Sequence, residues 1–475
     1  MKTDNKHIIE HYLTDLFLSE NIEVTTQRNA LFESFINDEH NIALVNAILK
    51  NQKIMVTDWK IKNRVEDIKQ QSFMIPNATV GKIYSTSIDL KINNWTDLIY
   101  FHLEGLENIG GVEFNKDTST IFGNPEQSGE YKIKLKYRLE EEEEDSELHE
   151  KIISFIINPD PKSLWKNIAS NTEDEFWKED DITAFGKIAN KHIVVASKRG
   201  RSHANVGSFR DDDFSFSNLE ASGWSIVVVS DGAGSAKISR HGSKLACDYI
   251  KDYFKTVLSE EQISKLDSLI IQNQRDSNDD VKKNLNLLIY NLIGGGAKKV
   301  HDQLSDFALA NNYTLNDLNS TLIFALFKPF DFGTAVLTFG VGDCPIAVIP
   351  KDFSEVKLMN WLDVGEFGGG TRFITTTEIF SSPKFASRIN FKVISDFKFI
   401  FLMTDGIYDP KFVVEANLEK VEKWKEFADD LNGDNEMCIK VNLDPANKDI
   451  EKQLSDWMDF WSPGNHDDRT LAIIF

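Results

Sequence analysis

The sequence contains few cysteines, fewer basic than acidic residues, and no long apolar run. Its three cysteines, Cys247, Cys344 and Cys438, are far apart and form no CxxC pair, which argues against a disulfide framework or a zinc site and favours a reducing compartment. The 75 acidic and 53 basic residues give a net charge of −22, which argues against nucleic acid or an anionic membrane surface as the partner.

No stretch approaches the ~18–20 uninterrupted apolar residues that a membrane span requires. Asp4, Glu10 and Asp15 interrupt the first apolar segment, which excludes the apolar core of a signal peptide. Hydrophobic residues make up 41% of the 475 residues, enough for substantial cores, and this length predicts two or three domains. We therefore expect a cytoplasmic protein of several domains.

Residues 1–65 predict a helical N-terminal element made of short amphipathic helices. Apolar residues recur there with helical spacing, as in Leu31–Ile36 and in Ile42–Leu49. No group of residues in this segment indicates chemistry, so we expect it to pack against or dock onto other protein.

The pattern changes to that of strands at residues 72–158. Tyr131–Tyr137 alternates polar and apolar residues, and Ile153–Ile157 makes a second alternating strand. The acidic run Glu140–Glu144 lies between them and predicts a solvated loop that discourages pairing at the sheet edge.

Several short motifs in this segment resemble the immunoglobulin-like repeat of bacterial surface and multidomain proteins. The motifs are Ile75–Tyr84, Leu103–Leu106, Phe114–Thr118, Ile121–Pro125 and Ser128–Tyr131. The resemblance implies an all-β sandwich with Gly and Pro turns at short intervals, which serves as a spacer or binds a protein partner.

A linker is predicted at Asn158–Ser163, where two prolines disfavour a helix and remove backbone donors. The remaining residues, 183–475, alternate apolar strands with helical patterns, the clearest at 245–254, 413–431 and 446–461. We predict a mixed α and β domain of this length.

Two apolar runs of this last domain end in an aspartate followed by glycine, Ile226–Gly232 and Phe399–Gly406. Glycine allows the sharp turn that fixes the carboxylate at the edge of a core. Acidic residues also end a strand or turn at Asp211–Asp213, at Asp343 and at Asp467–Asp468. Carboxylate oxygens are the ligands that Mg²⁺ and Mn²⁺ prefer, although a single Asp-Gly is usually only a turn.

The order of these motifs resembles that of the metal-dependent protein phosphatases of the PP2C type. The matching segments are Asp211-Asp212, Val229–Ala236, Ser320-Thr321, Phe339–Cys344, Leu402–Asp409 and Asp467–Thr470. Gly365–Phe373 further resembles a feature of a bacterial subgroup of this family. The resemblance implies an α-β-β-α sandwich of two antiparallel sheets flanked by helices.

The resemblance also implies a site for two Mn²⁺ or Mg²⁺ ions. Asp231 would bridge the ions, the Gly232 carbonyl would bind one, and Asp405 and Asp467 would complete the shell of the other. Asp343 would help to hold a third, weaker ion. A water that bridges the ions would attack the phosphorus of a phosphomonoester in line, with no covalent phosphoenzyme.

Asp211 and Asp212 correspond to an early acidic pair of the family and would orient coordinated waters as further metal ligands. Asp211 is shorter than the Glu or Gln of that pair, and Asp468 replaces an Asn. The resemblance therefore predicts Asp231, Asp212, His203 and Arg210 as the catalytic residues.

Two departures concern the substrate. The arginine expected before the acidic pair is Gly207, so that Arg201, His203 or Arg210 would meet the substrate phosphate, and the histidine that eukaryotic members place after Asp-Gly is Ala233. His203 would bind phosphate or donate a proton, or would only cap a loop.

We thus expect a bacterial serine/threonine phosphoprotein phosphatase that acts on a phosphorylated protein, linked to a Ser/Thr kinase in signalling. The alternatives are a catalytically silent protein of this fold that binds phosphorylated partners, and a hydrolase of small phosphorylated metabolites. Gly368–Gly370 lacks the Lys-Ser/Thr of a P-loop and is interpreted as a flap beside the site.

Overall fold

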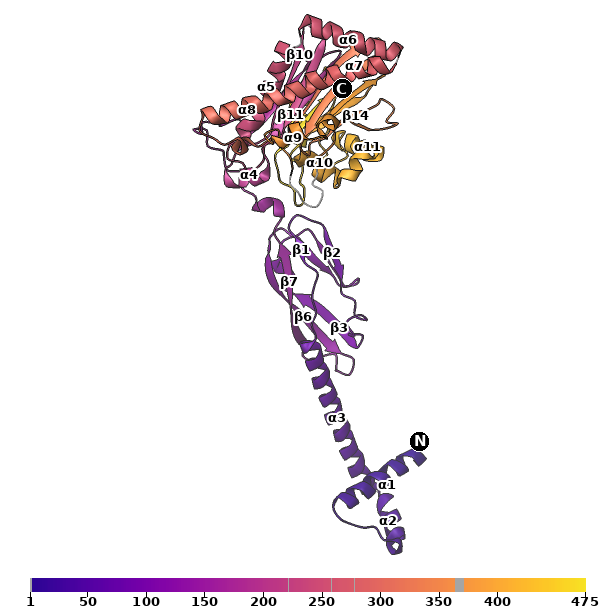
Figure 1. The fold of residues 1–475 in the computed structure, drawn as a ribbon. Helices are drawn as coiled ribbons and strands as arrows, with labels where there is room; N and C mark the ends of the chain where they lie inside the picture. The colour runs from indigo at the N-terminus through magenta and orange to yellow at the C-terminus, as the bar shows by residue number, and fades with distance from the viewer. Residues whose placement is uncertain (1, 221, 258, 277, 364–370) are drawn as a thin grey trace. The chain divides into compact units, whose positions relative to one another are not determined.

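The computed structural model describes residues 2–220, 222–257, 259–276, 278–363 and 371–475 (Figure 1). The chain divides into two compact units, Met1–Leu164 and Trp165–Phe475. Among the described helices, none combines the length and the apolar character that crossing a membrane would require.

The first unit begins with three helices, α1 (Lys2–Ser19), α2 (Asn29–Ile36) and α3 (Glu39–Gln70). The Asp38 side chain caps α3 by accepting hydrogen bonds from two backbone amides. A small core of Ile9, Leu13, Ile36 and Val45 joins the three helices. The prediction of short helices is wrong for α3, which has 32 residues.

Two sheets follow in the same unit, with strand orders β1-β7-β6-β3 and β2-β5-β4. Their strands are β1 (Ala78–Thr79), β2 (Tyr84–Ser87), β3 (Leu98–Glu104), β4 (Val112–Asn115), β5 (Thr120–Gly123), β6 (Gly129–Leu139) and β7 (His149–Asn158). Alternate residues of β6 and β7 are buried, as the sequence predicted for Tyr131–Tyr137 and Ile153–Ile157. Both sheets share one core, which includes Val65 and Ile68 of α3.

The second unit contains two antiparallel sheets, with strand orders β10-β11-β12-β13-β16 and β15-β14-β17-β18-β9-β8. The strands are β8 (Asp181–Ile188), β9 (Lys191–Lys198), β10 (Asp213–Leu219), β11 (Trp224–Ser230), β12 (Leu322–Phe330), β13 (Gly333–Val341), β14 (Ile346–Ile349), β15 (Lys357–Leu358), β16 (Ile389–Ile394), β17 (Phe399–Met403) and β18 (Arg469–Ile474).

Helices cover the outer faces of these sheets (Figure 1). They are α5 (Ser239–Val257), α6 (Glu260–Arg275), α7 (Asp279–Ile289), α8 (Gly295–Ala310), α9 (Glu378–Ser381), α10 (Asp405–Phe412), α11 (Val421–Leu431) and α12 (Ile450–Trp457). Among the described residues, those of the short helix α4 (Arg201–Val206) contribute to neither of the cores beneath these helices. The helix expected around 245–254 is part of α5. Those expected at 413–431 and 446–461 are shorter, because α11 begins only at Val421 and α12 only at Ile450.

Three cores give this unit four layers. Ile226 and Val228 of β11 pack outward against α5–α8, whereas Val227 and Val229 pack between the two sheets. A third core joins the other sheet to α10–α12. Since β11 is buried on both faces, its sequence is a continuous apolar run rather than an alternating one.

Candidate metal centre

Strand pairing brings the acidic strand ends to one edge of each sheet. Asp213 at the start of β10 pairs with Ser230 at the end of β11, so the segment before β10 lies beside Asp231. In the other sheet, the end of β17 pairs with the start of β18, and the Thr404 amide donates to the Thr470 carbonyl at 3.0 Å. Asp405 and the segment before β18 therefore lie at a common edge.

The glycine of each Asp-Gly pair allows another acidic segment to approach closely. A Cβ on Gly232 would lie 2.6 Å from the Asp211 carbonyl oxygen, and a Cβ on Gly406 would lie 1.9 Å from the Asp468 carbonyl oxygen. Real Cβ atoms do not approach oxygen so closely, so both positions require glycine for packing. The Asp-Gly pairs thus hold four acidic segments together rather than only turning the chain.

Five carboxylates interact strongly as a result: Asp212 is buried, Asp231, Asp343 and Asp405 are half-buried, and Asp467 is exposed. Burial raises the pKa of Asp231 well above its usual range, and the charges of Asp405, Asp212, Asp467 and Asp343 raise it further. Burial, followed by the charges of Asp467, Asp343 and Asp212, has the same effect on the pKa of Asp405. These carboxylates form one cluster that is short of positive charge. We refer to Asp212, Asp231, Asp343, Asp405 and Asp467 as the carboxylate cluster.

Asp212 is fixed by two hydroxyl groups. Its Oδ2 accepts hydrogen bonds from Thr404 Oγ1 at 2.8 Å and from Thr470 Oγ1 at 2.7 Å. Its Oδ1 is buried and has no hydrogen-bond partner among the described residues. Burial, and after it the charge of Asp468, raises the pKa of Asp212 to about 7.

Asp343 shows the same arrangement at the end of β13. Thr371 Oγ1 donates to its Oδ2 at 2.7 Å, while its Oδ1 is buried and unpartnered within the described part of the chain. One oxygen each from Asp231 and Asp343 and the Cys344 Sγ lie within 4.8 Å of one another. Burial raises the pKa of the Cys344 thiol well above its usual range, so the two carboxylates are the ligands that this group offers.

Asp211 belongs to a second group, beside the carboxylate cluster. His203 Nδ1 lies 3.0 Å from both oxygens of Asp468, and His203 Nε2 lies 3.8 Å from Asp211 Oδ2. Asp468 also accepts hydrogen bonds from the Gly200 and Asp211 amides at 2.6 and 2.5 Å. Burial opposes protonation of His203, but the hydrogen bond and charge of Asp468 raise its pKa to about 9.

Two arginines that were expected to meet phosphate have other partners. Arg210 is 1% exposed and donates hydrogen bonds to the Glu179 and Asp212 carbonyls and to Ser197 Oγ. Arg201 donates to the carbonyls of residues 459 and 460. The role proposed for Arg210 is therefore wrong, because its guanidinium is enclosed. Gly207 ends α4 with φ of 71°, a left-handed conformation that an arginine would adopt only with strain.

No role was predicted from the sequence for three residues that organise the site, Thr404, Thr470 and Asp468, although Asp468 was recognised as part of a motif. Each is next to or within a recognised motif, as the residue before Asp405 and as members of the Asp467–Thr470 segment. The sequence feature that could have identified them is a polar residue placed directly at the end of an apolar strand. The expected flap at Gly368–Gly370 lies outside the described residues, whereas Thr371, which follows it, contacts Asp343.

The donor set fits hard divalent cations. All members of the carboxylate cluster offer oxygen, and two of their oxygens are buried with no hydrogen-bond partner in the described ranges. Their mutual repulsion favours the binding of positive charge. Asp231, Asp405, Asp467 and Asp343 are the residues that would hold such ions. Asp212 would orient a coordinated water through its other oxygen, since Thr404 and Thr470 already donate to its Oδ2.

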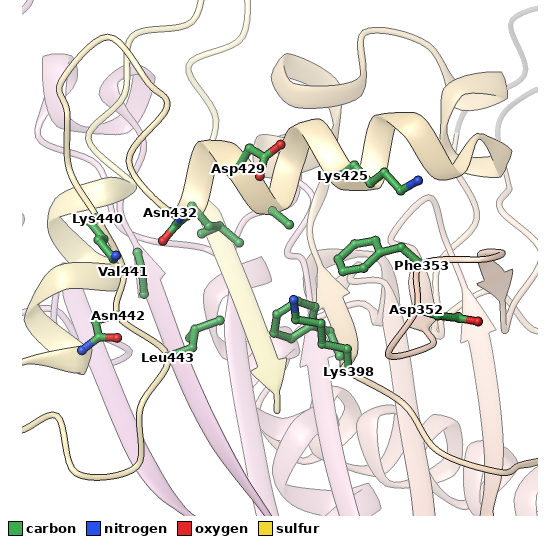
Figure 2. A pocket seen from close by; sticks show the side chains of 13 residues that line it. Asp352, Phe353, Lys398, Lys425, Asp429, Asn432, Lys440, Val441, Asn442 and Leu443 are labelled. Carbon is green, nitrogen blue, oxygen red and sulfur yellow. The ribbon is translucent and has the colours of Figure 1, made fainter.

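A separate pocket of about 580 Å³ lies at the other end of β17 (Figure 2). Lys398, Lys425 and Lys440 line it together with Phe353 and Phe399, and Lys398 Nζ lies 5.0 Å from the Phe353 ring centroid. Phe399 opens β17, so the pocket is about 20 Å from Asp405 along an extended strand. The pocket is therefore distinct from the carboxylate cluster.

Comparisons with known proteins identify a family and several similar solved structures. The sequence matches the family described as protein phosphatase 2C over residues 199–458. Solved structures similar to this one include a bacterial serine phosphatase (15% identity, 59% of this chain and 96% of that chain, TM-score 0.33). Others are a serine/threonine phosphatase from Staphylococcus aureus (14%, 64% and 98%, 0.34) and one from S. agalactiae (13%, 60% and 99%, 0.35). No curated protein matches the chain.

Proposed function

Since this chain belongs to the protein phosphatase 2C family, we propose that it is a metal-dependent phosphatase of phosphoserine and phosphothreonine in proteins. The observation that carries the proposal is the carboxylate cluster. Separate strand ends bring its members together, and burial leaves them unfavourably charged unless cations bind. A fold that had lost catalysis would have no reason to keep this costly arrangement.

The site would hold two Mn²⁺ or Mg²⁺ ions through Asp231, the Gly232 carbonyl, Asp405 and Asp467, and a third, weaker ion beside Asp343. When bound, such ions lower the pKa of water and neutralise phosphoryl oxygens.

The side chains around the ions would prepare the site for substrate. Thr404 and Thr470 hold Asp212 in one orientation, so that its free Oδ1 can accept a hydrogen bond from a water in the site. Asp211 lies beside His203 and would orient a second water. His203, held in its cationic form by Asp468, would contact the substrate phosphate or return a proton to the leaving oxygen.

Hydrolysis of p-nitrophenyl phosphate by the full chain in Mn²⁺ tests the proposal. We expect turnover that a chelator abolishes and that Asp231→Ala or Asp405→Ala reduces at least a thousandfold. Asp352→Ala, which removes an exposed carboxylate from the separate pocket, is the matched control and keeps full activity. A comparison of phosphopeptides with sugar phosphates and nucleotides then separates a protein phosphatase from a hydrolase of small metabolites.

A catalytically silent protein that binds phosphorylated partners is the second candidate. It is favoured by the burial of Arg210 and by Gly207, since neither offers a guanidinium to the phosphate. Retained phosphopeptide binding without turnover, or turnover that Asp231→Ala leaves unchanged, would decide for this candidate.

For the first unit we propose an immunoglobulin-like sandwich at residues 72–158, supported by two sheets over one core, and a role in binding a protein partner. A Ser/Thr kinase would supply the phosphorylated substrate in the cytoplasm. Co-purification of the kinase with the full chain, compared with a chain that lacks residues 1–158, tests this role.

A further inference from the structure

A row of exposed apolar side chains runs along α3. Leu44, Ile48, Met55 and Trp59 are 49%, 44%, 65% and 65% exposed. At 3.6 residues per turn their Cα positions fall within an arc of about 60° around the helix axis, so they form one continuous face. Exposed apolar surface arranged in this way marks an interaction site more often than scattered single residues do. We call these four residues the α3 row.

Neither core of the first unit covers the α3 row. Val45 and Leu49 pack in the core that joins α3 to α1 and α2. Ile61, Val65 and Ile68 pack in the core that joins α3 to the two sheets. Both sets lie roughly 70–150° around the helix from the centre of the row. Within the described residues the row therefore faces away from both cores.

The spacing of the α3 row is symmetric. Its members are separated by four, seven and four residues, and the midpoint lies between Asn51 and Gln52. We propose that the α3 row pairs with the α3 row of a second copy of this chain, with the two helices antiparallel. A two-fold axis at the midpoint then places Leu44 opposite Trp59 and Ile48 opposite Met55 of the other copy. Asn51 and Gln52 meet at the centre, where the Asn51 Oδ1 can accept from the Gln52 amide of the other copy while the Asn51 Nδ2 donates to the Ala47 carbonyl at 2.8 Å.

The charges on α3 favour a second copy over an acidic partner or an anionic membrane. Lys50, Lys53 and Lys60 lie roughly 130–150° around the helix from the centre of the row, on its far side. They would face solvent in the pair and would not repel one another across the contact. Lysines that recruit an acidic surface would instead flank the apolar face. Lys62, next in the row, would meet the uncharged Asn41 of the other copy.

The size of the α3 row indicates a reversible dimer. Four half-exposed side chains of this kind offer on the order of 400 Å² of apolar surface per copy, and about 800 Å² in the pair. This area is below the ~1,200 Å² of stable specific interfaces and is typical of weak, transient contacts. The pair should therefore dissociate on dilution.

Sedimentation velocity of the full chain tests the pairing. We expect a concentration-dependent species of twice the chain mass of 54.1 kDa. Met55→Glu should shift the sample to the mass of one chain, because it places a charge in the row. Ile54→Glu is the matched control: Ile54 is 48% exposed but lies off the row, so this variant should still dimerise. Circular dichroism checks that both variants keep their helices.

Disulfide trapping tests the orientation, in a Cys438→Ser background that removes the exposed native thiol. Oxidation of a mixture of the Ile48→Cys and Met55→Cys variants should give mostly mixed dimers. A preference for Met55→Cys dimers with themselves would overturn the antiparallel arrangement. A wild-type chain that stays at one chain mass when concentrated would overturn the second copy as the occupant, as would a dimer that Met55→Glu leaves intact.

Discussion

Arg388 and Asp363 form a buried ion pair that holds the turn carrying Asp343. Arg388 Nη1 lies 2.6 Å from Asp363 Oδ2 and Nη2 lies 2.8 Å from Oδ1, and the two side chains are 1% and 4% exposed. Asp363 also accepts a hydrogen bond from the Gly342 amide at 2.9 Å, and its own amide donates to the Gly342 carbonyl at 2.8 Å. The pair therefore connects the residue before β16 to Gly342, the neighbour of Asp343 in the carboxylate cluster.

We expect Arg388→Leu to lower the free energy of unfolding by about 3–5 kcal/mol, because it leaves the Asp363 carboxylate buried without its counter-ion. Urea unfolding measures the loss. The control is Lys351→Ala, which breaks the exposed Lys351–Asp396 pair and should cost less than about 1 kcal/mol. An equal, small effect of both substitutions would show that the buried pair does not stabilise the turn.

A second prediction concerns how much the carboxylate cluster destabilises the metal-free fold. Asp231→Asn keeps the shape of the side chain but removes one of the mutually repelling charges. In a chelator, the variant should therefore be more stable than the wild type, by on the order of 1–3 kcal/mol. Thermal unfolding with and without Mn²⁺ measures the stability of the metal-bound and the metal-free protein. The wild type should gain stability on adding Mn²⁺, and the variant should gain much less.

Asp352→Asn is the control for this prediction, since Asp352 is exposed and lies in the separate pocket. It should leave both the chelated stability and the gain from Mn²⁺ unchanged. If Asp231→Asn instead destabilises the chelated protein, the carboxylates of the cluster do not repel one another enough to favour bound cations.

The sequence predicted which carboxylates would meet but not how they are held. An apolar run that ends in Asp-Gly already shows where the chain must turn at a core edge, so Asp231 and Asp405 could be recognised locally. The partners of Asp468 come from Gly200, His203 and Asp211, more than 250 residues away, and depend on strand register. For the same reason, nothing local indicated that Arg210 is enclosed.

The length of α3 was missed for a different physical reason. Its apolar residues face one core at Val45 and another core at Val65, so the amphipathic pattern changes face along the helix. A prediction based on one continuous apolar face ends the helix at the residue where that face stops. The segment between the two core-facing parts carries the exposed apolar residues Met55 and Trp59, so its sequence lacks the pattern of a simple amphipathic helix.

The third prediction is a pH dependence of the chelated protein. Burial, followed by the charge of Asp468, raises the pKa of Asp211 to about 6 and that of Asp212 to about 7, above the usual value of 3.8. Since both values are raised in the fold, the stability that these groups contribute is present below about pH 4 and is lost as the pH rises to about 7.

Asp212 alone accounts for on the order of 4 kcal/mol of this loss, which should appear as the difference between the wild type and Asp212→Asn. Urea unfolding in a chelator between about pH 4 and pH 7 measures it, and subtraction of the variant removes the contribution of other groups. Mn²⁺ should abolish the difference between the two proteins in how the free energy of unfolding changes with pH. Parallel pH profiles of the two proteins in the chelator would contradict the shifted pKa of Asp212.

The fourth prediction uses two glycines of the same turn. A Cβ on Gly232 would lie 2.6 Å from the Asp211 carbonyl oxygen and 3.0 Å from Asp211 Cβ, whereas a Cβ on Gly234 would meet only His203 Nε2 at 3.8 Å. Gly232→Ala must therefore push the Asp211 segment away from Asp231, at a cost of about 1–3 kcal/mol. Gly234→Ala changes the same type of residue without such a clash and should cost less than about 0.5 kcal/mol.

The two variants should also differ in metal affinity, because the clash displaces the segment that carries Asp211 and Asp212 relative to Asp231. Calorimetric titration with Mn²⁺ should show affinity reduced at least tenfold for Gly232→Ala and affinity close to that of the wild type for Gly234→Ala. If both variants bind Mn²⁺ as the wild type does, the close approach of Asp211 to Gly232 does not set the spacing of the ligands. The ions would then depend on side-chain rotation alone, and the Asp-Gly pairs would act only as turns.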